Sequence, residues 1–192
     1  MSALLLNAPQ REAIHYLDGP SLVLAGAGSG KTRVITQKIA YLITECGFNP
    51  ANIAAITFTN KAAKEMVERI NKLMGGRATK GLVVCTFHAL GVRIVRQEAQ
   101  LLGLKPQFSI LDSSDTTQII SEMIGSTDKN RAKAIQWQIS SWKNALIEPN
   151  EAAQLANDEV ASSAALLYQE YDKTLRAYQG VDFDDLIRLP VK

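Results

Sequence analysis

The sequence has few cysteines, no long hydrophobic run and little net charge. Cys46 and Cys85 lie far apart and form no Cys-x-x-Cys pair, which argues against a disulfide framework or zinc on sulfur. We expect two reduced, buried thiols in a cytosolic protein. No apolar run approaches the length of a membrane span, and Leu4 to Leu6 is too short for the core of a signal peptide. These absences predict a soluble, cytoplasmic protein that has no contact with a membrane.

Charge and length leave the class of partner open. The formal net charge of +2 is too small to indicate a polyanion partner, so any nucleic-acid site must be a local patch. With 46% hydrophobic and 21% charged residues, the chain has the composition of a globular protein. Its 192 residues suffice for one ordinary domain or two small ones.

Three short apolar runs, each followed by a helical pattern, stand in the first half of the chain. The runs are residues 21–25, 53–58 and 81–86, and we predict that each is a strand. Asn60 is the predicted N-cap of the helix that follows the second run. This alternation predicts an α/β fold, with a parallel sheet covered by helices on both faces and ligands at the carboxyl ends of the strands.

The pattern changes after about Gly103. Apolar residues from Leu104 to about Gln179 recur at intervals of three and four, with no strand-like run between them. We therefore predict a helical subdomain here, with helices starting near Asp112 and Pro149. Its Trp and Tyr residues follow the apolar period, so we expect core positions for Trp142, Tyr168, Tyr171 and Tyr178.

A glycine-rich stretch, "LAGAGSGKT" at residues 24–32, links the first predicted strand to a helix. Glycines let successive backbone N–H groups turn toward phosphate oxygens at a helix N-terminus, where the helix dipole favours anions. Lys31 is placed to reach the β and γ phosphates, and the Thr32 hydroxyl to bind magnesium. Ala25 departs from the usual pattern, which has glycine there. A plain glycine-rich turn is the alternative, but it leaves the Lys-Thr pair after the last glycine unexplained.

Four stretches together resemble one protein family. "AGAGSGKTRVIT" is similar to the nucleotide loop of superfamily 1 DNA helicases of the Rep, UvrD and PcrA type, in which alanine is usual at the position of Ala25. "LLLNAPQREAI" resembles the family's Q motif, "ITFTNKAAKEM" its motif Ia and "CTFHALGVRIVR" its motif Ib. "SSWKN" and "VDFDDLI" extend the likeness over essentially the whole chain, and it is strongest to the Rep branch.

The resemblance implies a binding site for ATP and magnesium. Gln10 would read the edge of adenine, and Arg33 would stack near it, although both could equally be solvated surface residues. Lys31 and Thr32 would act in catalysis, with Thr32 as a magnesium ligand. The implied nucleotide site comprises Gln10, Ala25, Gly26, Ala27, Gly28, Ser29, Gly30, Lys31, Thr32 and Arg33.

The family likeness also implies a surface for single-stranded DNA. An aromatic ring beside hydroxyl and amide groups can stack on a base and bind phosphate or sugar oxygens. The alternatives are that Phe58 belongs to the core, that Asn60 is only an N-cap and that His88 is structural. The implied DNA-binding residues are Phe58, Thr59, Asn60, Thr86, Phe87 and His88.

The acidic half of an ATPase site is missing from the pattern. An Asp-Glu pair should follow an apolar strand, where it would hold magnesium and position the attacking water. Asp182, Asp184 and Asp185 instead precede apolar residues, and residues 178–180 do not read as a buried strand, so we reject them as the magnesium site. We expect the acidic pair, the arginine finger and a second motor domain beyond Lys192, in a longer helicase of which this chain is the N-terminal part.

The interpretation that follows is an ATP-dependent 3′–5′ helicase acting on single-stranded DNA and its junctions with duplex. Residues 1–103 would form the N-terminal part of a RecA-like domain (1A), 104–180 an all-helical insertion (1B) and 181–192 a return segment. The chain alone would lack ATPase and unwinding activity. The alternatives are a P-loop kinase or NTPase for a small molecule, and a non-catalytic module that binds nucleotide or DNA.

Overall fold

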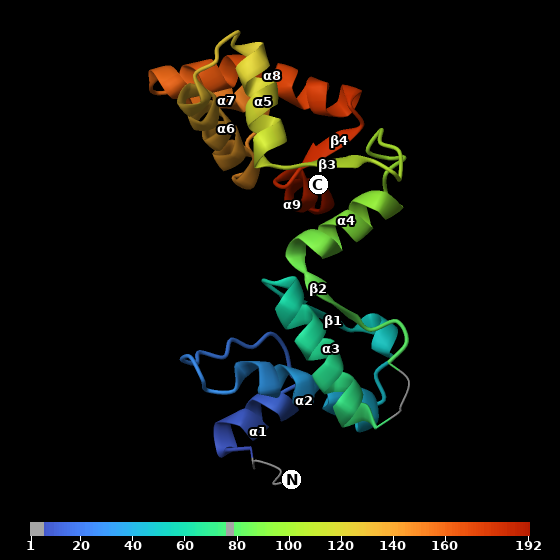
Figure 1. Cartoon of the computed structure of the whole chain (residues 1–192). Helices are drawn as coiled ribbons and strands as arrows, with labels where there is room; N and C mark the ends of the chain where they lie inside the picture. The colour runs from blue at the N-terminus through green and yellow to red at the C-terminus, as the bar shows by residue number, and fades with distance from the viewer. Residues whose placement is uncertain (1–5, 76–78) are drawn as a thin grey trace. The chain divides into compact units, whose positions relative to one another are not determined.

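The computed structural model describes residues 6–75 and 79–192, and the chain folds as two compact units, Met1–Phe87 and His88–Lys192 (Figure 1). Leu4 and Leu5, which belong to the stretch that resembles the Q motif, lie outside the described residues. In the described ranges, none of the helices is long and apolar enough to cross a membrane.

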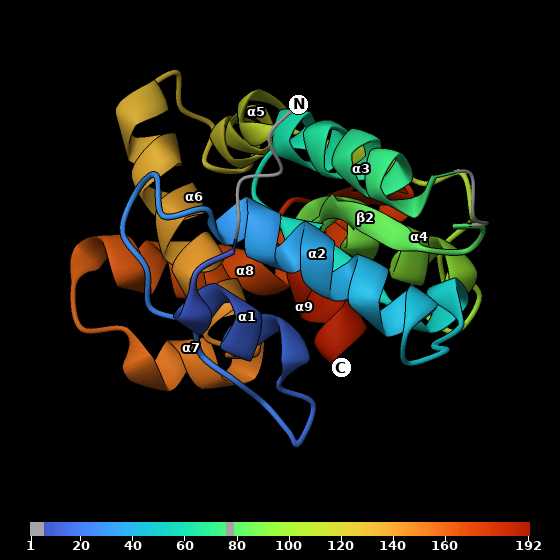
Figure 2. The ribbon, with the colours of Figure 1, turned by 90° about the horizontal axis from the view of Figure 1, so that it is seen from below.

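The first unit combines helices with a small parallel sheet. Its elements are α1 (Ala8–His15), α2 (Lys31–Thr44), a 3-10 turn (Pro50–Asn52), β1 (Ala54–Thr57), α3 (Asn60–Met74) and β2 (Val83–Thr86). β1 and β2 pair in parallel, in a register that runs from Ala54 opposite Val83 to Thr57 opposite Thr86. Helix α1 lies beside α2 (Figure 2), and α3 contacts both strands. The strands predicted at 53–58 and 81–86 are confirmed in shorter form as β1 and β2, and a helix follows each.

One predicted strand of this unit does not form. Residues 21–25 have no strand geometry, and Leu22 and Leu24 are 84% and 85% exposed. A strand exists only through hydrogen bonds to a neighbour. Within residues 6–75 and 79–192, β1 and β2 pair only with each other, so no segment pairs with this run. The predicted larger sheet is thus reduced to two strands here.

The N-cap prediction for α3 is also wrong by one residue. The helix begins at Asn60, and the Thr59 hydroxyl accepts a hydrogen bond from the Ala62 amide at 3.1 Å. Thr59 has the extended backbone that a cap requires, whereas Asn60 already belongs to the first turn. The Asn60 side chain is therefore left exposed and outside the cap.

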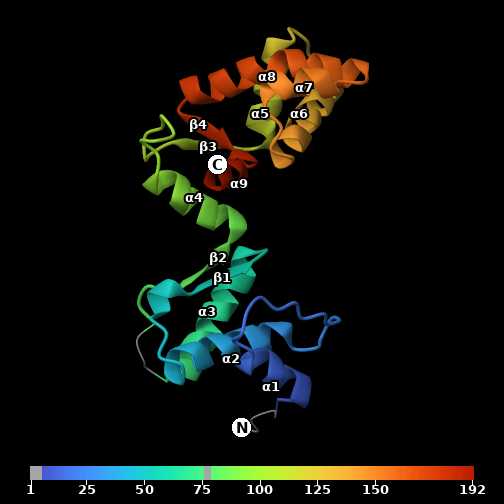
Figure 3. The ribbon, with the colours of Figure 1, turned by 180° about the vertical axis from the view of Figure 1, so that it is seen from behind.

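The second unit is mostly helical. Its elements are the greater part of α4 (Phe87–Gln97), then β3 (Ser109–Leu111), α5 (Ser113–Met123), α6 (Lys129–Asn144), α7 (Pro149–Leu155), α8 (Glu159–Ala177), β4 (Gly180–Asp182) and α9 (Asp185–Val191). Helices α5 to α8 pack together, as Figure 3 shows. The helix starts predicted near Asp112 and Pro149 are confirmed, since Asp112 caps α5 and α7 begins at Pro149.

Two short strands in this unit were not predicted. β3 and β4 pair in parallel, with Ser109 opposite Gly180 and Leu111 opposite Asp182. All three residues of β4 are buried, so the expectation that residues 178–180 are no buried strand is wrong for Gly180, although Tyr178 and Gln179 lie outside the strand. A three-residue strand carries too few positions to show alternation, and only its distant partner stabilises it.

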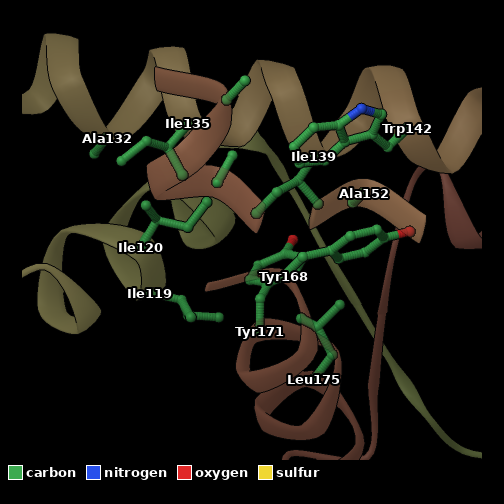
Figure 4. Close-up of a cluster of buried hydrophobic side chains, with 12 residues drawn as sticks. Ile119, Ile120, Ala132, Ile135, Ile139, Trp142, Ala152, Tyr168, Tyr171 and Leu175 are labelled. Carbon is green, nitrogen blue, oxygen red and sulfur yellow. The ribbon is translucent and has the colours of Figure 1, made fainter. Parts of the chain in front are cut away.

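The core of the helical bundle confirms most of the aromatic assignments. Trp142 and Tyr168 stack with ring centroids 6.1 Å apart, and both are buried with Tyr171 (Figure 4). Tyr178 was expected in the core but is 60% exposed, because the helix ends at Ala177 and the chain turns away at this point. The remaining members of this core are Ile119, Ile120, Ala132, Ile135, Ile139, Ala152, Ala161, Ala164 and Leu175.

A second apolar cluster of this unit joins α4 to the strand and helix at the end of the chain. It includes Val95 from α4, Val181 from β4 and Leu186 from α9, all nearly inaccessible. A Cβ atom on Gly91 would lie 1.9 Å from the carbonyl oxygen of Leu186, so only glycine allows this approach of the two backbones. The segment after residue 180 thus packs directly on α4.

The cysteine prediction holds in part. Cys46 and Cys85 are both free thiols, as expected, but each is partly exposed and not buried. Cys85 lies on β2, in a two-stranded sheet whose strands are only partly covered.

Candidate nucleotide loop and nucleic-acid surface

The N-terminus of α2 has the features of an anion site. Its N-cap is Gly30, in a left-handed conformation (φ 87°), and no side chain caps it. Asn7, Thr59, Asp112, Asp128 and Asp158, in contrast, cap other helices with side-chain oxygens. The first amides of α2 have no partner within the helix and point toward the loop before it. Such a helix end, preceded by an exposed loop, suits a phosphate group.

The side chain of Lys31, the first residue of α2, folds back onto the loop that precedes the helix. Lys31 Nζ donates to the carbonyl oxygens of Ala25 at 2.9 Å and Gly26 at 2.6 Å. The Ser29 hydroxyl donates to the Gly26 carbonyl oxygen at 2.8 Å. Gly28 has a positive φ of 74°, and a Cβ there would meet no atom within 4 Å. The ammonium group therefore lies where it could exchange carbonyl partners for phosphate oxygens.

Gln10 connects α1 to this loop. Its Oε1 accepts from the Asn7 amide at 3.1 Å, which completes the capping box of α1. Its Nε2 donates to the Ser29 carbonyl oxygen at 3.0 Å and lies 3.1 Å from where a Cβ of Gly30 would be. The structure thus brings the predicted adenine reader to the edge of the predicted phosphate loop, a contact that sequence spacing alone did not indicate.

Thr32 and Arg33 occupy the first turn of α2, and both are partly buried. Their predicted roles, magnesium binding and adenine stacking, stay predictions. In the part of the chain that the structure describes, no group of three or more His, Cys, Asp and Glu side chains is arranged to hold a metal ion. A magnesium ion at Thr32 would therefore depend on the nucleotide for most of its ligands.

Two exposed aromatic rings lie at one edge of the small sheet. Phe58 follows β1 and Phe87 follows β2, and because Thr57 pairs with Thr86, both rings leave the sheet at the same level. Their centroids are 6.5 Å apart with a tilt of 58°, and the residues are 90% and 52% exposed. The alternative that Phe58 belongs to the core is therefore wrong. A solvent-exposed ring pair offers faces on which nucleobases can stack.

The polar residues of the predicted DNA surface differ in accessibility. Thr59 and Asn60 are exposed beside Phe58, although the Thr59 hydroxyl also caps α3. Thr86 is only 9% exposed, so its side chain is the least accessible of the six predicted contacts.

His88 belongs to the second unit, where its ring packs against Phe183. The two ring centroids are 5.5 Å apart and nearly perpendicular, at 85°. His88 is exposed, and Phe183 is 45% exposed. Phe183 was missed because the sequence analysis of "VDFDDLI" considered only its carboxylates. An aromatic residue directly after a strand, as at Phe58 and Phe87, was the signal that could have found it.

The three carboxylates around Phe183 have protein partners. Asp182 and Asp185 accept from Lys143 Nζ at 2.7 and 3.1 Å, and Asp184 accepts from Asn144 Nδ2 at 2.8 Å. The Lys143 ammonium group thus lies between the carboxylates of Asp182 and Asp185. Asp182 does end a short buried strand, which corrects the premise on which the sequence analysis rejected these residues.

Comparison with known proteins gives consistent matches over nearly the whole chain. The sequence model of the UvrD/REP helicase N-terminal domain matches residues 6–192. The chain is 46% identical over 188 residues to ATP-dependent DNA helicase Rep of Escherichia coli (strain K12), which covers 96% of this chain and 28% of that protein. It is 43% identical over 191 residues to ATP-dependent DNA helicase PcrA of Bacillus subtilis (strain 168), covering 97% and 26%. The chain thus spans about a quarter of the length of these relatives.

Proposed function

The chain belongs to the UvrD/REP helicase N-terminal domain family, and we propose that it forms the nucleotide-binding and single-stranded-DNA-binding part of an ATP-dependent 3′–5′ DNA helicase. The observation that carries the proposal is the uncapped N-terminus of α2 with Lys31 folded into the loop before it. The names of the Rep and PcrA relatives support ATP and DNA as ligands.

In this proposal the nucleotide is ATP with magnesium. The amides of residues 28–32 hold phosphate oxygens, Lys31 moves from the Ala25 and Gly26 carbonyls to the β and γ phosphates, and Thr32 gives a hydroxyl to the metal. Gln10 exchanges its bond to Ser29 for the edge of adenine, and Arg33 covers the base. The bound nucleotide supplies the phosphoryl group whose transfer to water releases the free energy for movement along DNA.

Single-stranded DNA, and its junctions with duplex, are the proposed nucleic-acid partners. Phe58 and Phe87 would stack on bases, while Thr59 and Asn60 bind the backbone. His88 and Thr86 are the further proposed DNA contacts, and Thr86 is the less accessible of the two. We place this activity in the cytoplasm, where two free cysteines stay reduced.

The fold assignment is part of the proposal. Residues 1–103 form the N-terminal part of a RecA-like domain (1A), residues 104–180 a helical insertion (1B) and residues 181–192 a return segment. The exposed apolar run at residues 21–25 supports this, because Leu22 and Leu24 are costly to leave in water and would be buried in the centre of a larger sheet. Hydrogen exchange at residues 21–25 in a longer protein would test this assignment, and rapid exchange there would contradict it.

We further propose that the chain alone does not turn over ATP. Hydrolysis needs a fixed metal, an oriented water and a cation opposite the developing charge, and an arginine finger alone contributes about 10³ to 10⁵ in rate. Asp182, Asp184 and Asp185 are engaged by Lys143 and Asn144 and are not available for that role. Phosphate release with and without single-stranded DNA tests this, and DNA-stimulated turnover would overturn it.

Binding of a fluorescent ATP analogue tests the nucleotide site. Lys31→Ala should weaken binding of the analogue at least tenfold, since a charge-assisted contact to phosphate is lost. Lys72→Ala, an exposed lysine of α3, is the matched control and should bind as the parent does. Equal affinity of the parent and Lys31→Ala would refute the site.

Two alternative functions make different predictions. A small-molecule kinase would transfer phosphate to a small acceptor. A non-catalytic module would show no turnover of ATP even in the longer protein.

A further inference from the structure

A fully buried lysine in the second unit joins four elements. Lys143, near the end of α6, has no exposed surface. Its Nζ lies 2.7 Å from a carboxylate oxygen of Asp182 in β4, 3.1 Å from Asp185 in α9 and 3.3 Å from Asp172 in α8. The ammonium group donates hydrogen bonds to Asp182 and Asp185, and its contact with Asp172 is an ion pair. No part of the proposed nucleotide or DNA chemistry uses this lysine.

A second cation and two phenols complete the group. Arg188 donates from Nε to Asp185 and from Nη2 to Asp172, at 3.1 and 3.0 Å. Its Nη1 lies 3.1 Å from the Tyr168 hydroxyl, and the Tyr171 hydroxyl donates to Asp182 at 2.9 Å. We call this group the Lys143 cluster. Its members are Lys143, Tyr168, Tyr171, Asp172, Asp182, Asp185 and Arg188.

Stability alone does not account for so many buried charges. Ions taken out of water lose their hydration, and well-packed apolar residues in their place are often equally stable or more so. Charged hydrogen bonds, however, fix the orientation of the groups that they join more strictly than apolar packing does.

The end of α6 holds the turn between β4 and α9 through several hydrogen bonds. Asp182 and Asp185, at the two ends of the turn, both bind Lys143, and the Asp185 amide donates to Asp182 Oδ1 at 2.8 Å. Asn144, next to Lys143, donates to Asp184 within the turn. Residues 182, 184 and 185 are therefore all held from the end of α6. Phe183 is the one residue of the turn whose side chain has no such bond.

The clamped turn sets Phe183 against His88. The ring of Phe183 packs edge-on to the His88 ring with centroids 5.5 Å apart, and three residues later the backbone of Leu186 touches Gly91 of α4. His88 and Gly91 both lie in the first turns of α4. The His88 ring thus contacts a residue of the turn, and the turn is bonded to Lys143.

We propose that Lys143 is a positioning residue for the DNA contact of His88, acting through Phe183. The proposal rests on the proposed function, in which His88 contacts single-stranded DNA. Lys143 touches no ligand itself. It fixes where the Phe183 ring stands, and Phe183 fixes the orientation of the imidazole.

A double-mutant cycle on single-stranded DNA affinity tests the proposal. Lys143→Met and Phe183→Ala should each weaken binding of a labelled oligonucleotide by about fivefold or more, the size of one weak stacking contact. The double variant should bind the oligonucleotide no more weakly than Phe183→Ala alone does, because Lys143 acts through the Phe183 ring. Lys143→Arg should restore part of the affinity. Lys173→Met removes the same charge from an exposed site of α8 and serves as the control. Additive losses would overturn the proposal.

A second measurement does not depend on DNA. The proton resonances of the His88 ring should shift between the parent and Lys143→Met, because the Phe183 ring current acts on them, while far-ultraviolet circular dichroism stays unchanged. If Lys143→Met does not fold, Asp182→Asn carries the test, since it keeps the shape of the side chain and removes its charge. Unchanged His88 resonances in a folded variant would overturn the inference. If His88→Ala binds DNA as the parent does, the proposed DNA contact fails, and the resonances still decide whether Lys143 positions the ring.

Discussion

Gln10 Nε2 donates a hydrogen bond of 3.0 Å to the carbonyl oxygen of Ser29, so the first helix is bound directly to the glycine-rich loop. The same amide caps α1 through its oxygen, at the Asn7 amide. The Gln10 side chain is therefore hydrogen-bonded both to the start of α1 and to the loop. In the proposed nucleotide site, adenine and Ser29 compete for this donor, which links recognition of the base to the loop that holds the phosphates.

Gln10→Ala should reduce the preference of the chain for ATP over GTP. One hydrogen bond contributes about 0.5–1.5 kcal/mol, which corresponds to a change of about two- to tenfold in relative affinity. Titration of labelled ATP and GTP analogues measures this ratio. Gln100→Ala, an exposed glutamine of the second unit, is the control and should leave it unchanged. An unaltered ratio in Gln10→Ala would mean that this side chain does not read the base.

Gly30→Ala and Gly26→Ala form a matched pair in the phosphate loop. Gly30 has φ 87°, and a Cβ there would lie 3.1 Å from Gln10 Nε2, whereas a Cβ at Gly26 would meet nothing within 4 Å. The left-handed backbone costs alanine about 1–2 kcal/mol, so we expect Gly30→Ala to lower both thermal stability and nucleotide affinity. Calorimetry and the same titration should find Gly26→Ala closer to the parent. The reverse order would contradict the loop conformation.

Phe58→Ala and Phe87→Ala should each weaken binding of single-stranded DNA. Stacking on one base contributes about 1–3 kcal/mol, so a loss of at least fivefold is expected for each. The dependence of affinity on salt should stay the same, because neither change removes a charge. Leu166→Ala, which truncates another strongly exposed apolar residue (83%), controls for general loss of apolar surface. Anisotropy titrations at two salt concentrations give both quantities.

The Asp182 carboxylate should make stability depend on acid. Burial by itself would raise the pKa of this group, but the Lys143 ammonium and the hydrogen bonds from Asp185 and Tyr171 outweigh burial and lower it. A carboxyl whose pKa is lower in the folded state stabilises the fold above its unfolded pKa, near 4, and this contribution is lost as pH falls through the folded pKa. The charged and titratable groups that act on it directly are Lys143, Tyr171 and Asp185, and Asp172 and Arg188 complete the Lys143 cluster around them.

The measurement is the difference in melting temperature between the parent and Asp182→Asn from pH 7 down to pH 3. The parent should melt at a higher temperature than the variant near neutral pH. The difference in melting temperature should shrink as the solution becomes more acidic than about pH 4. The Asp185 carboxyl should affect the pH dependence of stability with the opposite sign, because burial raises its pKa. A difference for Asp182→Asn that grows toward low pH would show that the pKa is raised and the ion pair to Lys143 does not form.

The sequence by itself determined those elements whose stabilising contacts are local. The strands at 54–57 and 83–86, the helices that follow them and the N-cap of α5 at Asp112 were all readable from apolar period and cap chemistry. The glycines, Lys31 and Thr32 of the phosphate loop lie side by side in the chain, so their spacing carried the prediction. The exposed residues that flank the strands were identified by family resemblance rather than by physics alone.

Tertiary structure decided whatever depends on partners distant in sequence. β3 forms only because β4 pairs with it, and the run at 21–25 is no strand because no segment of the described ranges pairs with it. Lys143 reads as an ordinary polar residue near the end of a helix, and only the packing of α6, α8, β4 and α9 shows that it is buried among three carboxylates. The contact of Phe183 with His88 arises in the same way. The period of apolar residues shows which face of a helix or strand is apolar. Which residues pack against that face is decided only when distant parts of the chain come together in the folded protein.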